Sequence, residues 1–108
     1  MKFLITESQL ENLIFRYLDN LNLHKVEDKG DYYFWSSKES WENGQYVVIS
    51  AYHKRKDCFV SSSLLVELST FFSLELGVAL SIIGEWVETK IDFEIDYPYS
   101  DYSGDMLF

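Results

Sequence analysis

The chain has 108 residues, which is long enough for one domain with a real core and too short for two. Hydrophobic residues make up 47% of it and aromatic residues 18%, so wholesale disorder is excluded. The net charge of −9 is uneven: residues 1–56 hold eight acids and eight bases, whereas residues 57–108 hold ten acids and one base. Such a field repels phosphate backbones and attracts basic surfaces. We therefore expect no direct nucleic-acid partner.

The first predicted element is a helix over residues 7–20. Thr6 and Gln9 form a T-x-x-Q capping box, and Ile5 and Leu10 are spaced as a hydrophobic staple. The following apolar residues then recur on one helical face. They are Leu10, Leu13, Ile14, Tyr17, Leu18 and Leu21.

The middle of the chain predicts an antiparallel β-meander. Asn43-Gly44 is a strong hairpin signal, and it lies between Trp41-Glu42 and Gln45-Tyr46. The stretch 46–52 is dense in β-forming residues and apolar on both faces at its centre, which favours a central position in the sheet. The basic turn Lys54-Arg55-Lys56 follows, either as a solvated turn or as a contact for the acidic half of a second copy. The predicted strands cover residues 23–27, 32–36, 46–52 and 58–60.

Two consecutive helices are predicted between residues 61 and 90. A serine of the triplet 61–63 caps the first, and Ser73 is the expected N-cap of the second, with Glu75 in its first turn. Gly77, Ser81 and Gly84 form a line of small residues, which indicates either the close approach of another backbone or a helix broken at Gly77.

The largely apolar stretch 59–83 is long enough to be considered as a membrane span. Glu67 and Glu75 fall inside it, and acidic side chains are costly at the centre of a bilayer. The amphipathic spacing suits a helical hairpin in a protein core better. We expect no membrane partner.

Two segments of the sequence resemble segments of a known class of small proteins. The opening Ile5-Thr6-Glu7-Ser8-Gln9-Leu10 resembles the start of many small proteins of tailed bacteriophages, and the helical segment Ile82-Ile83-Gly84-Glu85-Trp86-Val87-Glu88 is similar to one found in such proteins. The resemblance implies a small virion or infection-related protein and carries over no catalytic residue. It implies the cytoplasm of a bacterial host, or a virion, as the location. The first six residues turn polar too soon for a signal peptide.

The acidic C-terminal region predicts a half-buried strand and a tail. Ile91, Phe93, Ile95 and Tyr97 alternate with acidic residues, and Pro98 is expected to stop ladder pairing and to suit a sheet edge. We place a single domain at residues 1–97 and a tail at 98–108. The aromatic, apolar-ended tail either folds onto its own domain or docks on a partner.

The sequence gives little evidence for a catalytic or metal-binding site. The acids Asp92, Glu94 and Asp96 could converge on a hard cation, but a solvated strand face is the better interpretation. His53, Asp57 and Cys58 are close in sequence, yet Cys58 opens an apolar strand and reads as a buried structural cysteine. Phosphate-loop, zinc and hydrolase motifs are absent from the sequence. We predict no enzyme activity, no cofactor and no metal.

These observations predict an α+β fold: an N-terminal helix, a three- to four-stranded antiparallel meander, a two-helix hairpin packed on the sheet and a C-terminal acidic strand. The expected function is a non-enzymatic protein–protein interaction module, such as a small phage structural or assembly protein, with homo-oligomerisation open. The alternative is an acidic inhibitor (an anti-defence, immunity or nucleic-acid-mimic protein) that occupies a basic cleft of its target. The expected partner-binding residues are Trp35, Trp41, Asp92, Glu94, Asp96, Tyr99, Tyr102, Met106, Leu107 and Phe108.

Overall fold

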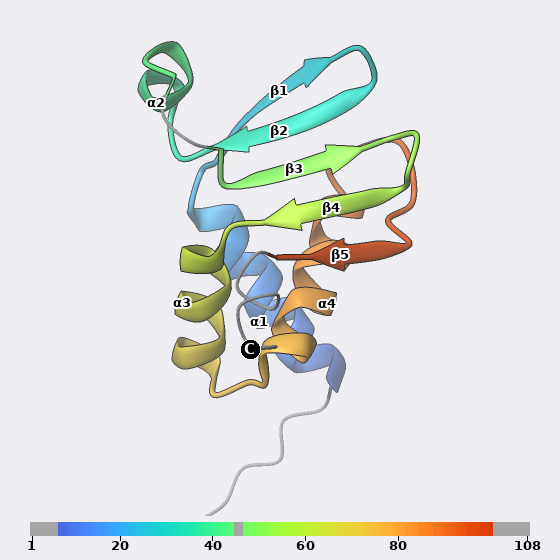
Figure 1. Cartoon of the computed structure of the whole chain (residues 1–108). Coiled ribbons are helices and arrows are strands. Elements are labelled where there is room, and N and C mark those ends of the chain that lie inside the picture. The colour runs from blue at the N-terminus through green and yellow to red at the C-terminus, as the bar shows by residue number, and fades with distance from the viewer. Residues whose placement is uncertain (1–6, 45–46, 101–108) are drawn as a thin grey trace, which may run out of the picture.

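The computed structural model describes residues 7–44 and 47–100, which form a compact α+β fold (Figure 1). In that part of the chain a sheet and four helices are present. In chain order the elements are α1 (Glu7–Asn20), β1 (His24–Asp28), β2 (Asp31–Trp35), α2 (Lys38–Glu42), β3 (Ile49–Tyr52), β4 (Asp57–Val60), α3 (Ser62–Phe72), α4 (Leu76–Glu88) and β5 (Tyr97–Tyr99).

The strands lie side by side in chain order, from β1 at one edge to β5 at the other (Figure 1). The first four are antiparallel, as the meander prediction required, and β3 is central. β5 pairs with β4 in parallel. A parallel neighbour needs a long crossover, which α3 and α4 provide.

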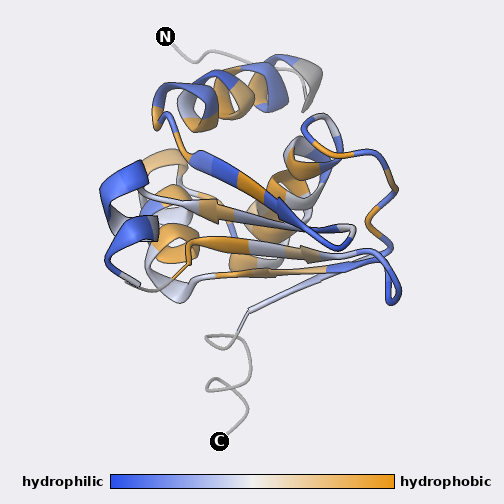
Figure 2. Cartoon of the chain, turned by 90° about the horizontal axis from the view of Figure 1, so that it is seen from above, coloured by the Kyte–Doolittle hydropathy of each residue, from blue (hydrophilic) through white to orange (hydrophobic). Residues whose placement is uncertain are grey.

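The helices α1 and α4 lie on the same side of the sheet, behind it in Figure 1 and above it in Figure 2. The core fills the space between, where the fully buried Ile14, Leu18 and Ile83 meet the sheet residues Phe34 and Ile49. The Phe34 and Trp86 rings are 5.7 Å apart. The edge strand β1 is mostly hydrophilic in Figure 2, which protects that edge from pairing with another chain.

The N-terminal helix is confirmed over Glu7–Asn20, and a polar cluster ties its end to α4. Trp86 Nε1 donates to Asp19 Oδ1 at 3.0 Å, and Lys90 Nζ lies 2.9 Å from the same oxygen. The expected partners at the other end of the helix, Ile5 and Thr6, lie outside the described residues.

The hairpin predicted at Asn43-Gly44 is wrong, because Lys38–Glu42 is a short helix, α2. Ser37 caps α2 by accepting from Ser40 N at 3.1 Å. Asn43 is its C-cap, and Gly44 follows with a φ of 71°. Glycine easily adopts the left-handed conformation, which occurs at the C-terminal ends of helices as well as in hairpin turns. Gln45 and Tyr46 lie outside the described residues.

The helix pair at 61–90 is present, but its second cap differs from the prediction. Ser61 caps α3 and accepts from Leu64 N at 3.4 Å, as expected. Ser73 is the C-cap of α3 rather than the N-cap of α4, and its φ is 56°. Glu75 is the N-cap of α4 and makes no side-chain capping bond. Leu74 N donates to Ser69 O at 2.8 Å, which is a helix-ending pattern.

The line of small residues was expected to indicate either the close approach of another segment or a break in the helix, and Gly84 shows a close approach. A β-carbon there would lie 3.2 Å from Cβ and Cγ of Pro98. The approaching group is thus a side chain of β5, within the same domain. Gly77 has nothing within 4 Å of such a carbon, and α4 runs unbroken from Leu76.

The strand predicted over residues 91–97 is wrong in its bounds, because β5 spans only Tyr97–Tyr99 and residues 91–96 follow an irregular path. The in–out alternation itself is real. Ile91, Phe93 and Ile95 are partly buried against the core, and the acids between them are exposed. Glu88 Oε2 accepts from Ile95 N at 2.6 Å, so the backbone is held by α4 rather than by a strand. Pro98 does not end the pairing, since it lies opposite Cys58 on the edge strand, where proline is tolerated.

No single helix in the described part of the chain is long and apolar enough to cross a membrane. The pair Ser62–Phe72 and Leu76–Glu88, bent by 110°, meets that criterion only when both helices are taken together, by length and composition. Leu65, Leu68, Ile83 and Val87 of this pair are fully buried in the core.

Candidate functional site

The sheet has one face covered by α1 and α4 and a second face rich in aromatic side chains. On the covered face, Phe34 pairs with Ile49 and Ile49 with Val60. Ala51 and Cys58, two residues further along their strands, pair with each other on the same face. The residues between them therefore point the other way. We call this second surface the aromatic face; it consists of Tyr33, Trp35, Tyr52, Phe59, Tyr97 and Tyr99.

Strand register arranges most of these rings in two adjacent rows. In the first row, Tyr33 pairs with Ser50, Ser50 with Phe59, and Phe59 with Tyr99. The second row contains Tyr52, Asp57 and Tyr97. Rings touch along and between the rows, with centroids 5.6 Å apart for Phe59–Tyr99, 6.0 Å for Tyr97–Tyr99 and 6.3 Å for Tyr33–Tyr52. The rings therefore form two touching groups, Tyr33 with Tyr52 and Phe59 with Tyr99 and Tyr97, in one layer that spans four strands.

Arg55 fixes one side of the aromatic face. Its guanidinium lies 4.6 Å from the centre of the Tyr52 ring, and its Nη2 donates to Tyr99 Oη at 3.5 Å. Its Nε lies 3.1 Å from Asp57 Oδ2. The other carboxylate oxygen of Asp57 is buried and has no hydrogen-bond partner within the described ranges. Burial, together with the Asp57 carboxylate, raises the pKa of Tyr99, so its phenol stays neutral near pH 7.

At one end of the aromatic face, α2 forms a cleft with the first two strands. The cleft has a volume of about 450 Å³ and is lined by Val26, Glu27, Asp28, Tyr33, Trp35 and Trp41. Trp41 of α2 is 41% exposed and packs on the His24 ring at 5.6 Å. Trp35 Nε1 is buried and, within the described ranges, has no hydrogen-bond partner. Trp35 and Trp41, both expected among the partner-binding residues, thus line the same cleft.

Beside this cleft, the β1–β2 and β3–β4 turns form a basic hollow of about 370 Å³ lined by Lys29, Asp31, Tyr52, His53, Lys54 and Arg55. Asp31 of the hollow pairs with Asp28 of the cleft. His53 Nδ1 lies 2.7 Å from Asp31 Oδ1, and His53 N donates to the same oxygen at 3.0 Å. Burial acts to raise the pKa of Asp31, but these two contacts outweigh it and the pKa is lowered. An oriented imidazole can act as a base, yet none of the residues lining this hollow is a serine, threonine or cysteine nucleophile.

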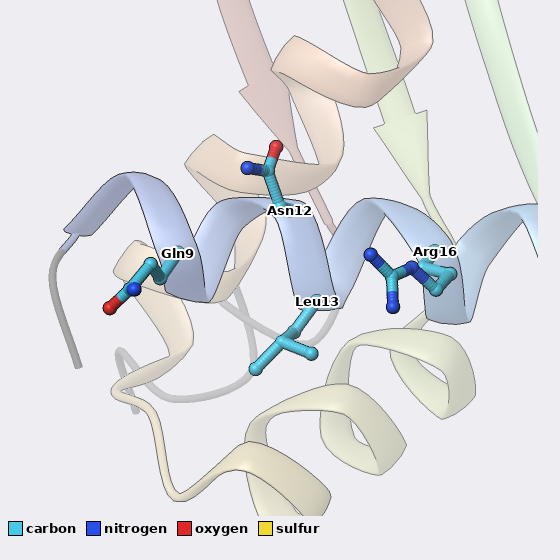
Figure 3. A pocket seen from close by; sticks show the side chains of 4 residues that line it. All are labelled: Gln9, Asn12, Leu13 and Arg16. Carbon is cyan, nitrogen blue, oxygen red and sulfur yellow. The ribbon is translucent and has the colours of Figure 1, made fainter. Parts of the chain in front are cut away.

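A further hollow, of about 410 Å³, lies along α1 and is lined by Gln9, Asn12, Leu13 and Arg16 (Figure 3). Figure 3 shows Asn12 pointing to the opposite side of the helix from Leu13. The polar groups do not converge on one point, so this surface lacks the arrangement of a binding site for a small molecule.

The acidic residues expected to contact a partner lie between α4 and β5. Asp92, Glu94 and Asp96 are all exposed there. Burial and the Asp92 carboxylate raise the pKa of Tyr32, which places Asp92 near the covered face rather than the aromatic face. Tyr99 lies in β5, whereas Tyr102, Met106, Leu107 and Phe108 lie outside the described residues.

Metal and thiol chemistry have no site in the described part of the chain. No three histidine, cysteine or acidic side chains come together there in a way that could hold a metal ion, so Asp92, Glu94 and Asp96 do not form such a group. Cys58 is fully buried, as predicted. Burial, with a smaller contribution from Asp57, raises its pKa to about 12. The thiolate needed for nucleophilic attack is therefore scarce at neutral pH.

Comparison with known proteins gives no match: no family model, curated sequence or solved structure is significantly similar to this chain. The candidate site therefore rests on its geometry. Tyr33, Tyr52, Phe59 and Tyr97 were not among the expected partner-binding residues, and the contact of His53 with Asp31 was not expected. The alternation Tyr32-Tyr33-Phe34-Trp35 carried the missing signal, because Tyr33 and Trp35 must share a face that excludes Phe34.

Proposed function

We propose that this protein is a non-enzymatic protein–protein interaction module that contacts its partner through the aromatic face. The observation that carries the proposal is the layer of touching rings on the side of the sheet opposite α1 and α4. Tyr97, at the edge of that layer, is 65% exposed. Aromatic side chains and arginine are enriched at the energetic centres of protein interfaces. Arg55 lies among these rings.

The rigidity of the layer supports this use. Its residues sit on paired strands, and Arg55 connects Tyr52, Asp57 and Tyr99. A preorganised surface loses little conformational freedom on binding. Together with the resemblance of the opening residues to small phage proteins, this favours a phage structural or assembly role, with a phage structural protein or a second copy of the chain as partner.

A photo-crosslinking experiment tests the proposal. The photoreactive residue p-benzoylphenylalanine is placed at Tyr97 in the full-length chain, in cells where the protein is naturally made. The matched control carries it at Phe71, an aromatic residue of α3 that is 67% exposed and away from the sheet. A defined adduct at position 97 and none at 71 supports the proposal, and mass spectrometry identifies the partner. Equal labelling at both positions, or none at 97, contradicts it.

The acidic inhibitor remains the second candidate because of one observation. Asp92, Glu94 and Asp96 all reach solvent, while the apolar residues between them pack inward. This spacing concentrates negative charge on one exposed segment, which would suit a basic cleft. Neutralising the three acids to Asn, Gln and Asn separates the candidates. An inhibitor loses its target with this variant and at high salt, whereas an assembly contact through the aromatic face survives both.

A further inference from the structure

The cleft between α2 and the first two strands combines two kinds of group that together select a cation. Trp35, Trp41 and Tyr33 supply aromatic rings, and Asp28 supplies a carboxylate. Glu27 also lines the cleft, but its pairing with Tyr32 places its side chain on the covered face. Aromatic faces attract cations through their negative quadrupole, most strongly for tryptophan. A carboxylate beside such rings adds direct attraction. A neutral apolar ligand would leave this carboxylate uncompensated.

The Asp28 carboxylate of the cleft is not paired with a basic side chain in the described part of the chain. The basic residue of α2, Lys38, is 4.0 Å from Glu42 on its own helix. A positive group supplied from outside would therefore meet an unpaired carboxylate.

We propose that this cleft binds the cationic side chain, arginine or lysine, of a segment of the partner protein. The inference rests on the proposed function and names the chemistry that the partner presents at this end of the aromatic face. The side chain enters between Trp41 and Trp35 and brings its charge to Asp28.

The test uses short blocked peptides and the indole N–H signals of the full-length protein. The peptides are acetyl-Gly-Gly-Arg-Gly-Gly-amide, its lysine equivalent, and two neutral counterparts in which citrulline replaces arginine and norleucine replaces lysine. Trp86 is an internal reference, because it is 3% exposed and donates to Asp19 on the other side of the sheet. Substitution of each tryptophan by phenylalanine assigns the three signals.

The expected result is a saturable shift of the Trp35 and Trp41 signals with at least one cationic peptide, while the Trp86 signal stays in place. Citrulline and norleucine peptides should shift neither. Trp41→Ala should weaken binding about fivefold, the effect of one exposed cation–π contact. Asp28→Asn should weaken binding and reduce its dependence on salt. Because Trp41 and Asp28 are exposed, both variants should fold, and an unmoved Trp86 signal confirms this.

Equal binding of the neutral peptides would overturn the proposal, since the cleft would then be merely apolar. Absence of any shift with both cationic peptides would overturn it as well. Neither result touches the crosslinking test at Tyr97, so the interaction function can stand while this inference falls. Conversely, cation binding in the cleft without a crosslink at Tyr97 would leave the cleft established and contradict the aromatic face as the main contact.

Discussion

Pro98 of β5 lies directly against Gly84 of α4, so closely that a β-carbon on Gly84 would come within 3.2 Å of the proline ring. This contact joins the last strand to the helix that precedes it. It also explains why a residue with poor helix propensity stands in the middle of α4. Gly77, in the first turn of the same helix, faces open space.

The two glycines predict opposite responses to the same substitution. Gly77→Ala should stabilise the protein by up to about 1 kcal/mol, because alanine favours the helix and meets nothing. Gly84→Ala should lose that gain, since its methyl group presses on Pro98, which is held in the strand pairing. Chemical denaturation of both variants measures the difference. Equal stabilisation by both substitutions would show that β5 shifts easily to accommodate the added methyl group.

Cys58 should be unreactive in the native protein. Burial raises its pKa to about 12, and the side chain has no exposed surface. At pH 8 the native thiol should react with a disulfide reagent at least a hundredfold more slowly than in denaturant, because access requires local or global opening. The rate of thiol release is followed by absorbance. Rapid labelling without denaturant would show that β4 opens readily.

Asp19 should contribute a pH-dependent part of the stability. The Lys90 ammonium and the Trp86 N–H lower its pKa, and burial opposes them weakly. Because the folded pKa is lowered, the contribution is fully present above the unfolded value of about 3.9 and disappears as the pH falls through the folded value. Asp19→Asn keeps an acceptor for Trp86 and removes the charge.

This variant should cost about 0.5–1 kcal/mol at pH 7, the range of a half-exposed ion pair. The free energy of unfolding of both proteins is measured by denaturant titration from pH 7 to pH 2. The difference between them should shrink below pH 4 and at high salt. A difference that stays constant over this range would mean that Asp19 acts through packing rather than through its charge.

The two serines that flank α3 should respond in opposite directions. Ser61→Ala removes an N-cap acceptor and should cost about 1 kcal/mol. Ser73→Gly should stabilise by roughly 0.5 kcal/mol, because Ser73 has a φ of 56° where glycine is relaxed. Thermal unfolding of both variants provides the comparison. A destabilising effect of Ser73→Gly would show that relief of the left-handed conformation is smaller than the entropy that glycine adds to the unfolded chain.

Much of the architecture could be predicted from local patterns. The helical spacing of Leu10, Ile14 and Leu18 located α1, and the apolar run centred on Ile49 located the central strand. The α+β class followed from these elements. Asn43-Gly44 and Ser73 were misassigned because one local conformation serves more than one purpose. A left-handed residue closes a hairpin or ends a helix, and only the neighbouring contacts decide which.

The candidate site depended more on the tertiary structure. The sequence alone determined that the chain is acidic, aromatic and built around one core, and it predicted Trp35 and Trp41 as contact residues. Only the fold decided that these two line one cleft, that Tyr52, Phe59 and Tyr97 share a face, and that residues 91–96 alternate in burial without forming a strand. The reason is physical: periodicity reports which side of an element is buried, whereas strand register and crossover connections determine which distant side chains meet.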